Sequence, residues 1–226
     1  MRIQDVIPVK IRKQLLAFHQ SLLWKKSFNN FKEAIDKGEV PSKKVIKKLI
    51  YSWGNQGFSA QTDYLETCIK YTLSTKGNII ECGSGLSTLV IGYIAKVQKR
   101  KMISFEHIDV WAKRVQENID NFQLDNNTIY VRQLKNYGDF DWYDITNIDL
   151  STYDLVICDA PPSNTNGGRR GFIHLFKEKL EKNAIILVDD TIRMDEQQMI
   201  EEWKKILDIE VNFYGTFDPH AVIRIK

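Results

Sequence analysis

The sequence lacks long apolar runs, paired cysteines and a strong excess of charge of either sign. No apolar run approaches the ~18 residues that a membrane-spanning helix needs. The three cysteines have no metal-ligand spacing and two lie in apolar runs, so Cys68, Cys82 and Cys158 are interpreted as buried thiols in a reducing compartment. A formal net charge of +3 gives no argument for a nucleic-acid partner. The N-terminal stretch also lacks the apolar segment of a signal peptide, so we expect a cytoplasmic protein without a membrane span.

The chain of 226 residues has room for one globular domain with a sizeable core. Residues 1–77 show helical apolar periodicity, which predicts an N-terminal helical extension. From residue 78 short apolar runs alternate with amphipathic stretches. The candidate strands cover residues 78–83, 101–107, 128–134, 153–160 and 184–190. The candidate helices that accompany them cover residues 87–98, 110–122, 171–182 and 195–207.

This alternation predicts an α/β fold in which helices cover both faces of a mostly parallel sheet. The last two strand-like runs, residues 207–215 and 220–226, are joined by the short turn TFDP. Parallel neighbours need a connection of about a dozen residues. We therefore expect these two strands to form an antiparallel hairpin at the edge of the sheet.

A stretch of small residues, IIECGSGLST at residues 79–88, contains the end of the first candidate strand. Ligands bind beyond the carboxyl ends of the strands in an open α/β sheet, and glycines let the backbone approach a ligand closely. A bare turn is the alternative. The dinucleotide fingerprint G-x-G-x-x-G is broken where Thr88 replaces the third glycine. The next strand ends in Glu106, which is either a ribose-binding carboxylate or an ordinary surface glutamate.

The run ECGSGLS, residues 81–87, resembles the first motif of class I S-adenosylmethionine-dependent methyltransferases, which reads acidic-x-Gly-x-Gly-x-small. Ser87 departs from the usual glycine at the last position. The resemblance covers residues 78–226 and implies a Rossmann-like, mostly parallel sheet of seven strands with a C-terminal antiparallel hairpin. It also implies S-adenosylmethionine as the cofactor. The residues that hold it would be Glu81, Gly83, Ser84, Gly85, Ser87 and Glu106.

Aspartates stand at two further strand ends, Asp159 at one and Asp189 with Asp190 at the next. Carboxylates gathered at one edge raise each other's pKa, and a divalent cation such as Mg²⁺ would remove that cost. The pattern resembles the catechol-type, metal-dependent O-methyltransferases, in which an Asp and an Asp-Asn pair bind the metal. That resemblance implies metal binding by all three aspartates, with Asp in place of Asn. The alternatives are an acid that acts without a metal and a helix cap at Asp190.

Methyl transfer to oxygen requires the acceptor hydroxyl to lose its proton, either to a base or with the help of a bound cation. Asp159 is the predicted catalytic residue. Other candidate bases are His107, His174 and His220. Arg169 and Arg170 lie in a glycine-rich loop, where they could clamp a carboxylate or phosphate of the substrate. They could equally be solvated charges or partners of the loop's own aspartate.

The loop is also similar to that of the plant glucuronoxylan methyltransferases at Asp159, Pro161, Gly168 and Arg169. This similarity favours a sugar-containing or carboxylated substrate. The predicted function is therefore S-adenosylmethionine-dependent O-methylation of a small-molecule or sugar-containing acceptor, with a divalent metal as an optional aid. N-methylation, aminopropyl transfer and an inactive nucleotide-binding scaffold are the alternatives, and homo-oligomerisation stays open.

The N-terminal helical extension has no catalytic pattern of its own. Trp53, Phe58 and Ser59 are candidates for the border of an acceptor pocket. Four lysines lie at positions 43, 44, 47 and 48, where the common interpretation is a solvated helix face and the sharper one is a phosphate-rich partner.

Overall fold

The computed structural model describes residues 8–55, 60–162, 164–216 and 218–226. The chain divides into two compact units, Met1–Thr62 and Asp63–Lys226. No helix within the described residues is long and apolar enough to cross a membrane.

The described residues of the first unit form the helices α1 (Val9–Asp36) and α2 (Lys43–Trp53), which pack against each other. Apolar side chains recur at helical spacing on the packed faces and are excluded from water. The fully or almost fully buried ones are Phe28, Phe31, Ile35, Ile46, Leu49 and Trp53. The side chains of α1 and α2 also meet through a hydrogen bond of 2.9 Å between His19 Nδ1 and the Tyr51 hydroxyl.

In the second unit, seven of the described strands form one sheet in the order β3-β2-β1-β6-β7-β9-β8. The strands are β1 (Ile79–Cys82), β2 (Met102–Glu106), β3 (Asn127–Val131), β6 (Tyr153–Cys158), β7 (Leu180–Val188), β8 (Ile209–Tyr214) and β9 (His220–Ile225). The first five of these are parallel, whereas β9 pairs antiparallel with both β7 and β8. The predicted fold class, including the C-terminal antiparallel hairpin, is thereby confirmed.

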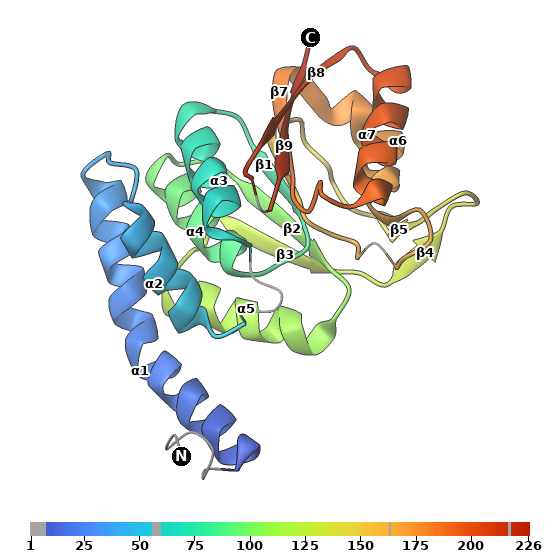
Figure 1. Ribbon diagram of the computed structural model, residues 1–226. Helices are drawn as coiled ribbons and strands as arrows, with labels where there is room; N and C mark the ends of the chain where they lie inside the picture. Colours follow the sequence, from blue (N-terminus) through green and yellow to red (C-terminus); the bar gives the residue numbers. More distant parts are fainter. Residues whose placement is uncertain (1–7, 56–59, 163, 217) are drawn as a thin grey trace. The chain divides into compact units, whose positions relative to one another are not determined.

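Helices cover both faces of this sheet, as expected for strands that are buried on both sides. They are α3 (Thr62–Ser74), α4 (Leu86–Val97), α5 (Asp109–Asn121), α6 (Gly171–Phe176) and α7 (Met194–Ile206). Figure 1 shows α6 and α7 on one side of the sheet and α3, α4 and α5 on the other. The largest apolar cluster lies under α6 and α7, where Phe172, Phe176 and Trp203 pack on side chains of the central strands.

Two local predictions were wrong. The run at residues 128–134 is not one strand, because the chain leaves the sheet after Val131 and forms a small hairpin of β4 (Leu134–Asn136) and β5 (Asp141–Tyr143). The helix expected over residues 171–182 ends early. A 3₁₀ turn over Lys177–Lys179 follows α6, and β7 already begins at Leu180, which pairs with Tyr153. Tertiary pairing overrides the helical pattern there.

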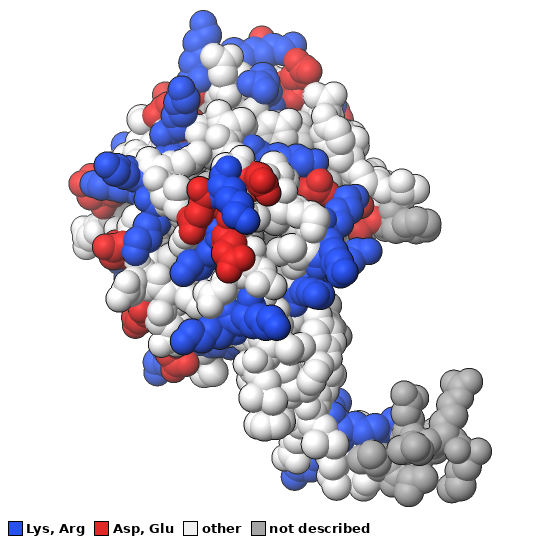
Figure 2. Space-filling view, turned by 90° about the vertical axis from the view of Figure 1, so that its left-hand side faces the viewer, with Lys and Arg blue, Asp and Glu red and all other residues white. Residues whose placement is uncertain are grey.

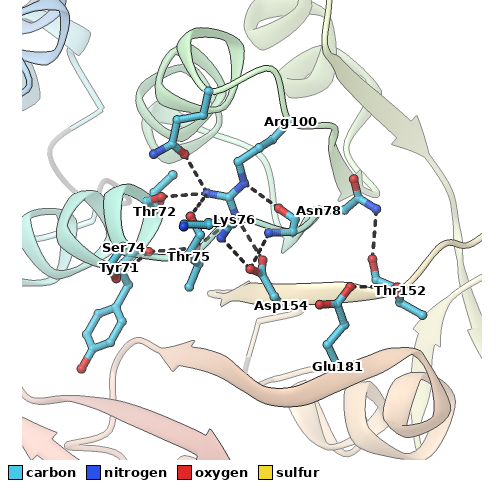
Figure 3. Close-up of polar contacts among 12 residues, drawn as sticks. Tyr71, Thr72, Ser74, Thr75, Lys76, Asn78, Arg100, Thr152, Asp154 and Glu181 are labelled. Carbon is cyan, nitrogen blue, oxygen red and sulfur yellow. Dashed lines mark hydrogen bonds and ion pairs between the residues drawn. The ribbon is translucent and has the colours of Figure 1, made fainter.

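The amino-terminal ends of the strands are joined by a buried ion pair (Figure 3). Arg100, which precedes β2, places Nη2 3.1 Å from Oδ1 of Asp154 in β6. The guanidinium also donates to the carbonyls of Thr72 and Gly77, while Asp154 accepts from the Gly77 N–H at 2.5 Å. This cluster ties α3, β1 and β6 together at the edge of the sheet opposite to the predicted ligand site.

Candidate active site

The carboxyl ends of the parallel strands meet at one edge of the sheet. The register places the last residues of β1 and β6, Cys82 and Cys158, side by side. The N–H of Asp159 donates to the Cys82 carbonyl at 3.1 Å, and the N–H of Asp189 donates to the Cys158 carbonyl at 3.3 Å. The segments that follow these strands therefore lie next to one another, as the topology of an open α/β sheet requires.

Two glycines shape the loop between β1 and α4 in different ways. Gly83 has φ +92°, and a Cβ there would lie 2.6 Å from the Cβ of Ala160, so both backbone and packing require glycine. A Cβ on Gly85 would meet no heavy atom within 4 Å. The Gly85 N–H donates to the hydroxyl of Thr88 at 2.8 Å. Protein packing does not demand glycine at residue 85, and the open space beside it is what a closely approaching ligand needs.

Glu81 is a fully buried carboxylate directly behind this loop. Its Oε2 accepts hydrogen bonds from the hydroxyls of Thr88 at 2.6 Å and Ser104 at 2.7 Å. No donor among the described residues reaches its Oε1. Burial raises the pKa of Glu81 to about 7, although the hydroxyls of Ser87, Thr88 and Ser104 act in the opposite direction. The predicted cofactor residues Glu81 and Ser87 are thus adjacent, and one oxygen remains for a further donor.

Glu106, at the end of β2, holds the glycine loop in place. Its Oε2 accepts from the N–H of Ser84 at 3.1 Å and from the Ser84 hydroxyl at 2.9 Å. Its Oε1 accepts from the N–H groups of His107 and Ile108 at 2.8 and 3.0 Å. The indole N–H of Trp111 donates to the Ser84 carbonyl at 2.6 Å. Four donors fill the lone pairs of a carboxylate, so a ribose diol would have to replace the contacts that Ser84 makes.

The aspartates at the ends of β6 and β7 surround a buried arginine. Nη2 of Arg169 lies 3.1 Å from Asp159 Oδ1 and 3.0 Å from Asp190 Oδ2. Its Nη1 donates to the Asp189 carbonyl at 2.6 Å and lies 3.9 Å from Oε1 of Glu196. The Arg169 side chain is only 2% exposed. A buried charge must be paired, and several carboxylates surround this guanidinium. A second, more exposed guanidinium also contributes, because Arg193 Nη1 lies 2.9 Å from Asp190 Oδ2 and 3.8 Å from Glu196 Oε1.

Burial and mutual repulsion raise the pKa values of these acids. Burial raises the pKa of Asp159 to about 6 against the opposing effect of Arg169. Burial, with Asp159 and Asp190 nearby, raises the pKa of Asp189 well above its ordinary value. Burial lowers the pKa of Arg169, but the surrounding carboxylates outweigh it and raise that pKa overall, so the guanidinium stays charged.

The predicted metal ion would need several carboxylates free to face one point. Within the part of the chain that the structure describes, no group of three or more His, Cys, Asp or Glu side chains is placed to hold an ion. Arg169 bridges Asp159 and Asp190, where a shared cation would have to bind, and Asp189 Oδ1 accepts the N–H of Asp190 at 2.9 Å. As arranged here, these residues do not fit a divalent cation.

The second predicted substrate arginine is also engaged by an acid. Arg170 pairs with Glu202 of α7 through two contacts, Nε to Oε2 at 2.7 Å and Nη2 to Oε1 at 2.9 Å. A cavity of about 240 Å³ lies beside Arg169 and Arg170. Its other lining residues include Thr165, Gly167, Asp195, Gln198 and Met199. The arginines border a space of small-molecule size, but each guanidinium already has protein partners.

The three histidines that are candidate bases lie in different surroundings. His107 Nδ1 lies 3.4 Å from Glu106 Oε1. The ring of His174 stacks on Phe140 with a centroid distance of 5.3 Å. His220 is buried in β9, and burial lowers its pKa. Asp159, whose side chain is 30% exposed, is the candidate base that lies beside the glycine loop.

Some residues of the site were not predicted from the sequence. Ser104 and Trp111 hold the loop and its acid, and Glu196 adds a carboxylate to the arginine. They lie within a strand or helix, where only tertiary structure shows what they contact. Of the proposed pocket residues, Trp53 is buried in the first unit, and Phe58 and Ser59 lie outside the described residues.

Comparisons with known proteins agree with this geometry. Residues 80–191 match a family model described as a methyltransferase domain. Similar solved structures include an O-methyltransferase from Bacillus cereus in complex with SAH, with 14% identity, TM-score 0.57 and coverage of 83% of this chain and 93% of that one. A provisionally assigned caffeoyl-CoA O-methyltransferase from Staphylococcus aureus has 15% identity and TM-score 0.59, and the match covers 87% of this chain and 99% of that one.

A third similar structure is a precorrin-6y C5,15-methyltransferase from Geobacter metallireducens, with 11% identity and TM-score 0.54. The match covers 75% of this chain and 90% of that one. The search of curated proteins found no match. At these identities the structural likeness shows the fold alone, and the family model covers the loop and both aspartate-bearing strand ends.

Proposed function

We propose that this chain, whose residues 80–191 match the model of a methyltransferase domain, transfers a methyl group from S-adenosylmethionine to a hydroxyl oxygen. The acceptor in this proposal is a small molecule or a sugar-containing compound. The observation that carries it is the open glycine loop after β1 together with acids at the carboxyl ends of β2, β6 and β7. Two O-methyltransferases among the proteins of similar fold support the choice of oxygen.

The residues around the loop fit the proposed cofactor in chemistry and in space. Gly85 leaves room for a ligand against the backbone, and Glu106 is the acid within reach of a ribose diol once Ser84 yields its contacts. Glu81 keeps one oxygen without a described donor, and with a pKa of about 7 it is about half ionised at neutral pH. A cationic ligand beside the loop would favour its charged form. When bound, S-adenosylmethionine supplies an electrophilic methyl group on a sulfonium.

Asp159 is the proposed base for the acceptor hydroxyl. Its pKa of about 6 leaves it largely ionised at neutral pH yet more basic than an ordinary aspartate. Arg169 holds Oδ1, so Oδ2 is the oxygen that would take the proton. Formation of the oxygen–carbon bond would be balanced by cleavage of the carbon–sulfur bond, with S-adenosylhomocysteine as the leaving group. No metal enters this proposal, because Arg169 already engages the carboxylates that a cation would need.

Calorimetric titration with S-adenosylmethionine tests the cofactor assignment. We expect wild type to bind in the presence of either Mg²⁺ or a chelator, and Glu106→Ala to bind roughly 10- to 100-fold more weakly, because charge-assisted hydrogen bonds are lost. Glu117→Ala removes an exposed glutamate of α5 and is the matched control. Absence of wild-type binding would refute the proposed activity. Equal binding by wild type and Glu106→Ala would refute only the assignment of Glu106 to the cofactor, not the proposed activity.

Release of S-adenosylhomocysteine tests the acceptor. Hydroxylated sugars and phenols are compared with primary amines at equal concentration, with and without chelator. We expect turnover with a hydroxyl acceptor, at a rate that is the same with and without chelator. Turnover with amines alone would favour the N-methylation alternative.

A further inference from the structure

The N-terminal unit carries an excess of positive charge that the proposed methyl transfer does not use. Residues 1–62 contain 12 Lys and Arg but 4 Asp and Glu, a formal net charge of +8. The remaining residues contain 20 Lys and Arg but 25 Asp and Glu, which gives a formal net charge of −5. The modest overall charge of +3 therefore hides two units of opposite sign. Such asymmetry between parts of a chain indicates an anionic partner for the basic part.

An apolar stripe runs along the first half of α1. Its members recur at spacings of four, three and four residues and are each between 46% and 64% exposed: Ile11, Leu15, Phe18 and Leu22. At 3.6 residues per turn, these four lie within roughly 60° of one another around the helix. The buried residues of α1, including Phe28 and Phe31, lie on roughly the opposite side. The stripe is therefore not the face with which α1 packs.

Basic side chains flank this stripe without acidic neighbours on the same segment. Arg12, Lys25 and Lys26 lie beside the stripe on the helical projection. No Asp or Glu occurs from residue 8 to residue 32. Figure 2 shows, next to the grey atoms at the N-terminus, white and blue side chains and no red ones on the visible face. The lysines of α2 at positions 43, 44, 47 and 48 add to the positive charge of the same unit.

Three kinds of partner have chemistry that bears on these features. A second copy that paired stripe to stripe would bring the cations of both helices together without compensating acids. The stripe also spans only two heptads, fewer than the three or four of a stable coiled coil. A nucleic acid would match the charge but would offer little to four exposed apolar side chains. An anionic lipid surface offers both phosphate groups and an apolar layer.

We propose that the Ile11–Leu22 stripe of α1 and its flanking cations dock on an anionic membrane surface. The helix would lie in the plane of the interface, with the apolar side chains at the acyl boundary and the basic ones at headgroup phosphates. Nothing in this proposal requires methyl transfer, so its failure and the failure of the proposed activity are distinguishable.

Flotation of the full chain with lipid vesicles tests the proposal. Vesicles of phosphatidylcholine alone are compared with vesicles that contain an equal part of phosphatidylglycerol, at low and high salt. We expect binding to the anionic vesicles that weakens with salt. Reversal of both Lys25 and Lys26 to Glu should weaken it by about 25-fold or more, at about fivefold per cation. Phe18→Ser should weaken it roughly tenfold, because a buried aromatic anchor is lost.

Matched controls separate docking from general effects of charge or folding. Val110→Ser removes an apolar side chain that is 79% exposed on α5, and Lys101→Glu with Lys113→Glu reverses two exposed cations of the second unit. We expect both controls to bind like wild type. Thermal unfolding checks that each variant is folded, which we expect because the changed side chains are exposed.

Several outcomes would overturn the proposal. One is no binding to anionic vesicles, and another is equal binding to both vesicle types. If the chain binds duplex DNA with dependence on Lys25 and Lys26 but not on Phe18, the partner is nucleic acid. If sedimentation shows a dimer that Phe18→Ser dissociates, and vesicles are not bound, the stripe is an interface between copies.

Discussion

Replacing Arg169 by Met is the sharpest test of how the acids at the carboxyl edge are kept together. The substitution keeps a long apolar stem but removes the charge that Asp159, Asp190 and Glu196 share. The guanidinium is 2% exposed, so water cannot take its place without rearrangement. Removing one partner of a buried ion pair costs about 3–5 kcal/mol. We expect the free energy of unfolding to fall by about that amount at neutral pH.

Arg170→Met is the matched control, because the same chemical change occurs one residue along the chain. The Arg170–Glu202 pair is about a third exposed on both sides. Solvent screens such pairs, whose contribution to stability is about 0–1 kcal/mol. Urea unfolding followed by circular dichroism measures both variants against wild type. Equal losses of stability in the two variants would refute the reasoning about burial.

The same variant also tests whether the arginine stands in place of a metal ion. Without Arg169, the carboxylates of Asp159 and Asp190 lose their common partner and repel each other. We expect Mg²⁺ or Mn²⁺ to raise the unfolding midpoint of Arg169→Met and to leave that of wild type unchanged. A ligand at 100 times its dissociation constant stabilises by about 2.7 kcal/mol. Stabilisation of wild type by the metal, or its inactivation by a chelator, would contradict this account.

Two further predictions follow from the pKa of the proposed base and from the opposite edge of the sheet. Because Asp159 must be ionised to accept a proton and its pKa is about 6, S-adenosylhomocysteine release should rise with pH through about 6 and then level off, and Asp159→Asn should lower it by about 10²- to 10⁴-fold. Because kcat/KM reports the pKa values of the free enzyme, a kcat/KM profile that is flat between about pH 5 and pH 8 would contradict that role. Arg100→Ala should lower the free energy of unfolding by about 3–5 kcal/mol, since it strands Asp154, yet leave S-adenosylmethionine affinity unchanged in calorimetry. A large loss of affinity in the folded variant would show that the two edges are coupled.

The sheet could be predicted from the sequence because its determinants are local. Runs such as residues 79–82 are apolar on both faces except at Glu81, and the link between β8 and β9 is too short for a crossover. The β4–β5 hairpin could not be predicted in this way. Its strands have three residues each, too few to show a period of two. Trp142 is buried there by packing against Phe172 of α6, a contact that no local pattern records.

The position of the candidate site was predictable, whereas the partners within it were not. Parallel strands bring their carboxyl ends to one edge, so Glu106 and Asp159 were bound to lie near the glycine loop. The contacts of Arg169 depend on how a loop folds back over that edge, ten residues after Asp159 and twenty before Asp189. From sequence alone, a substrate clamp and an internal counter-ion look identical.

The arginine of the site and the cations of α1 show why a net charge says little about function. Arg169 is surrounded by carboxylates within 4 Å, so its charge is neutralised inside the protein and holds the acids of the site together. The cations of α1 lie on a segment that has no acid over 25 consecutive residues, from residue 8 to residue 32, and they flank exposed apolar side chains. Among them, the exposed Arg12, Lys25 and Lys26 direct their charge to solvent and to whatever binds there. The same kind of side chain thus stabilises a site or offers a surface, and the distance to the nearest carboxylate decides between the two.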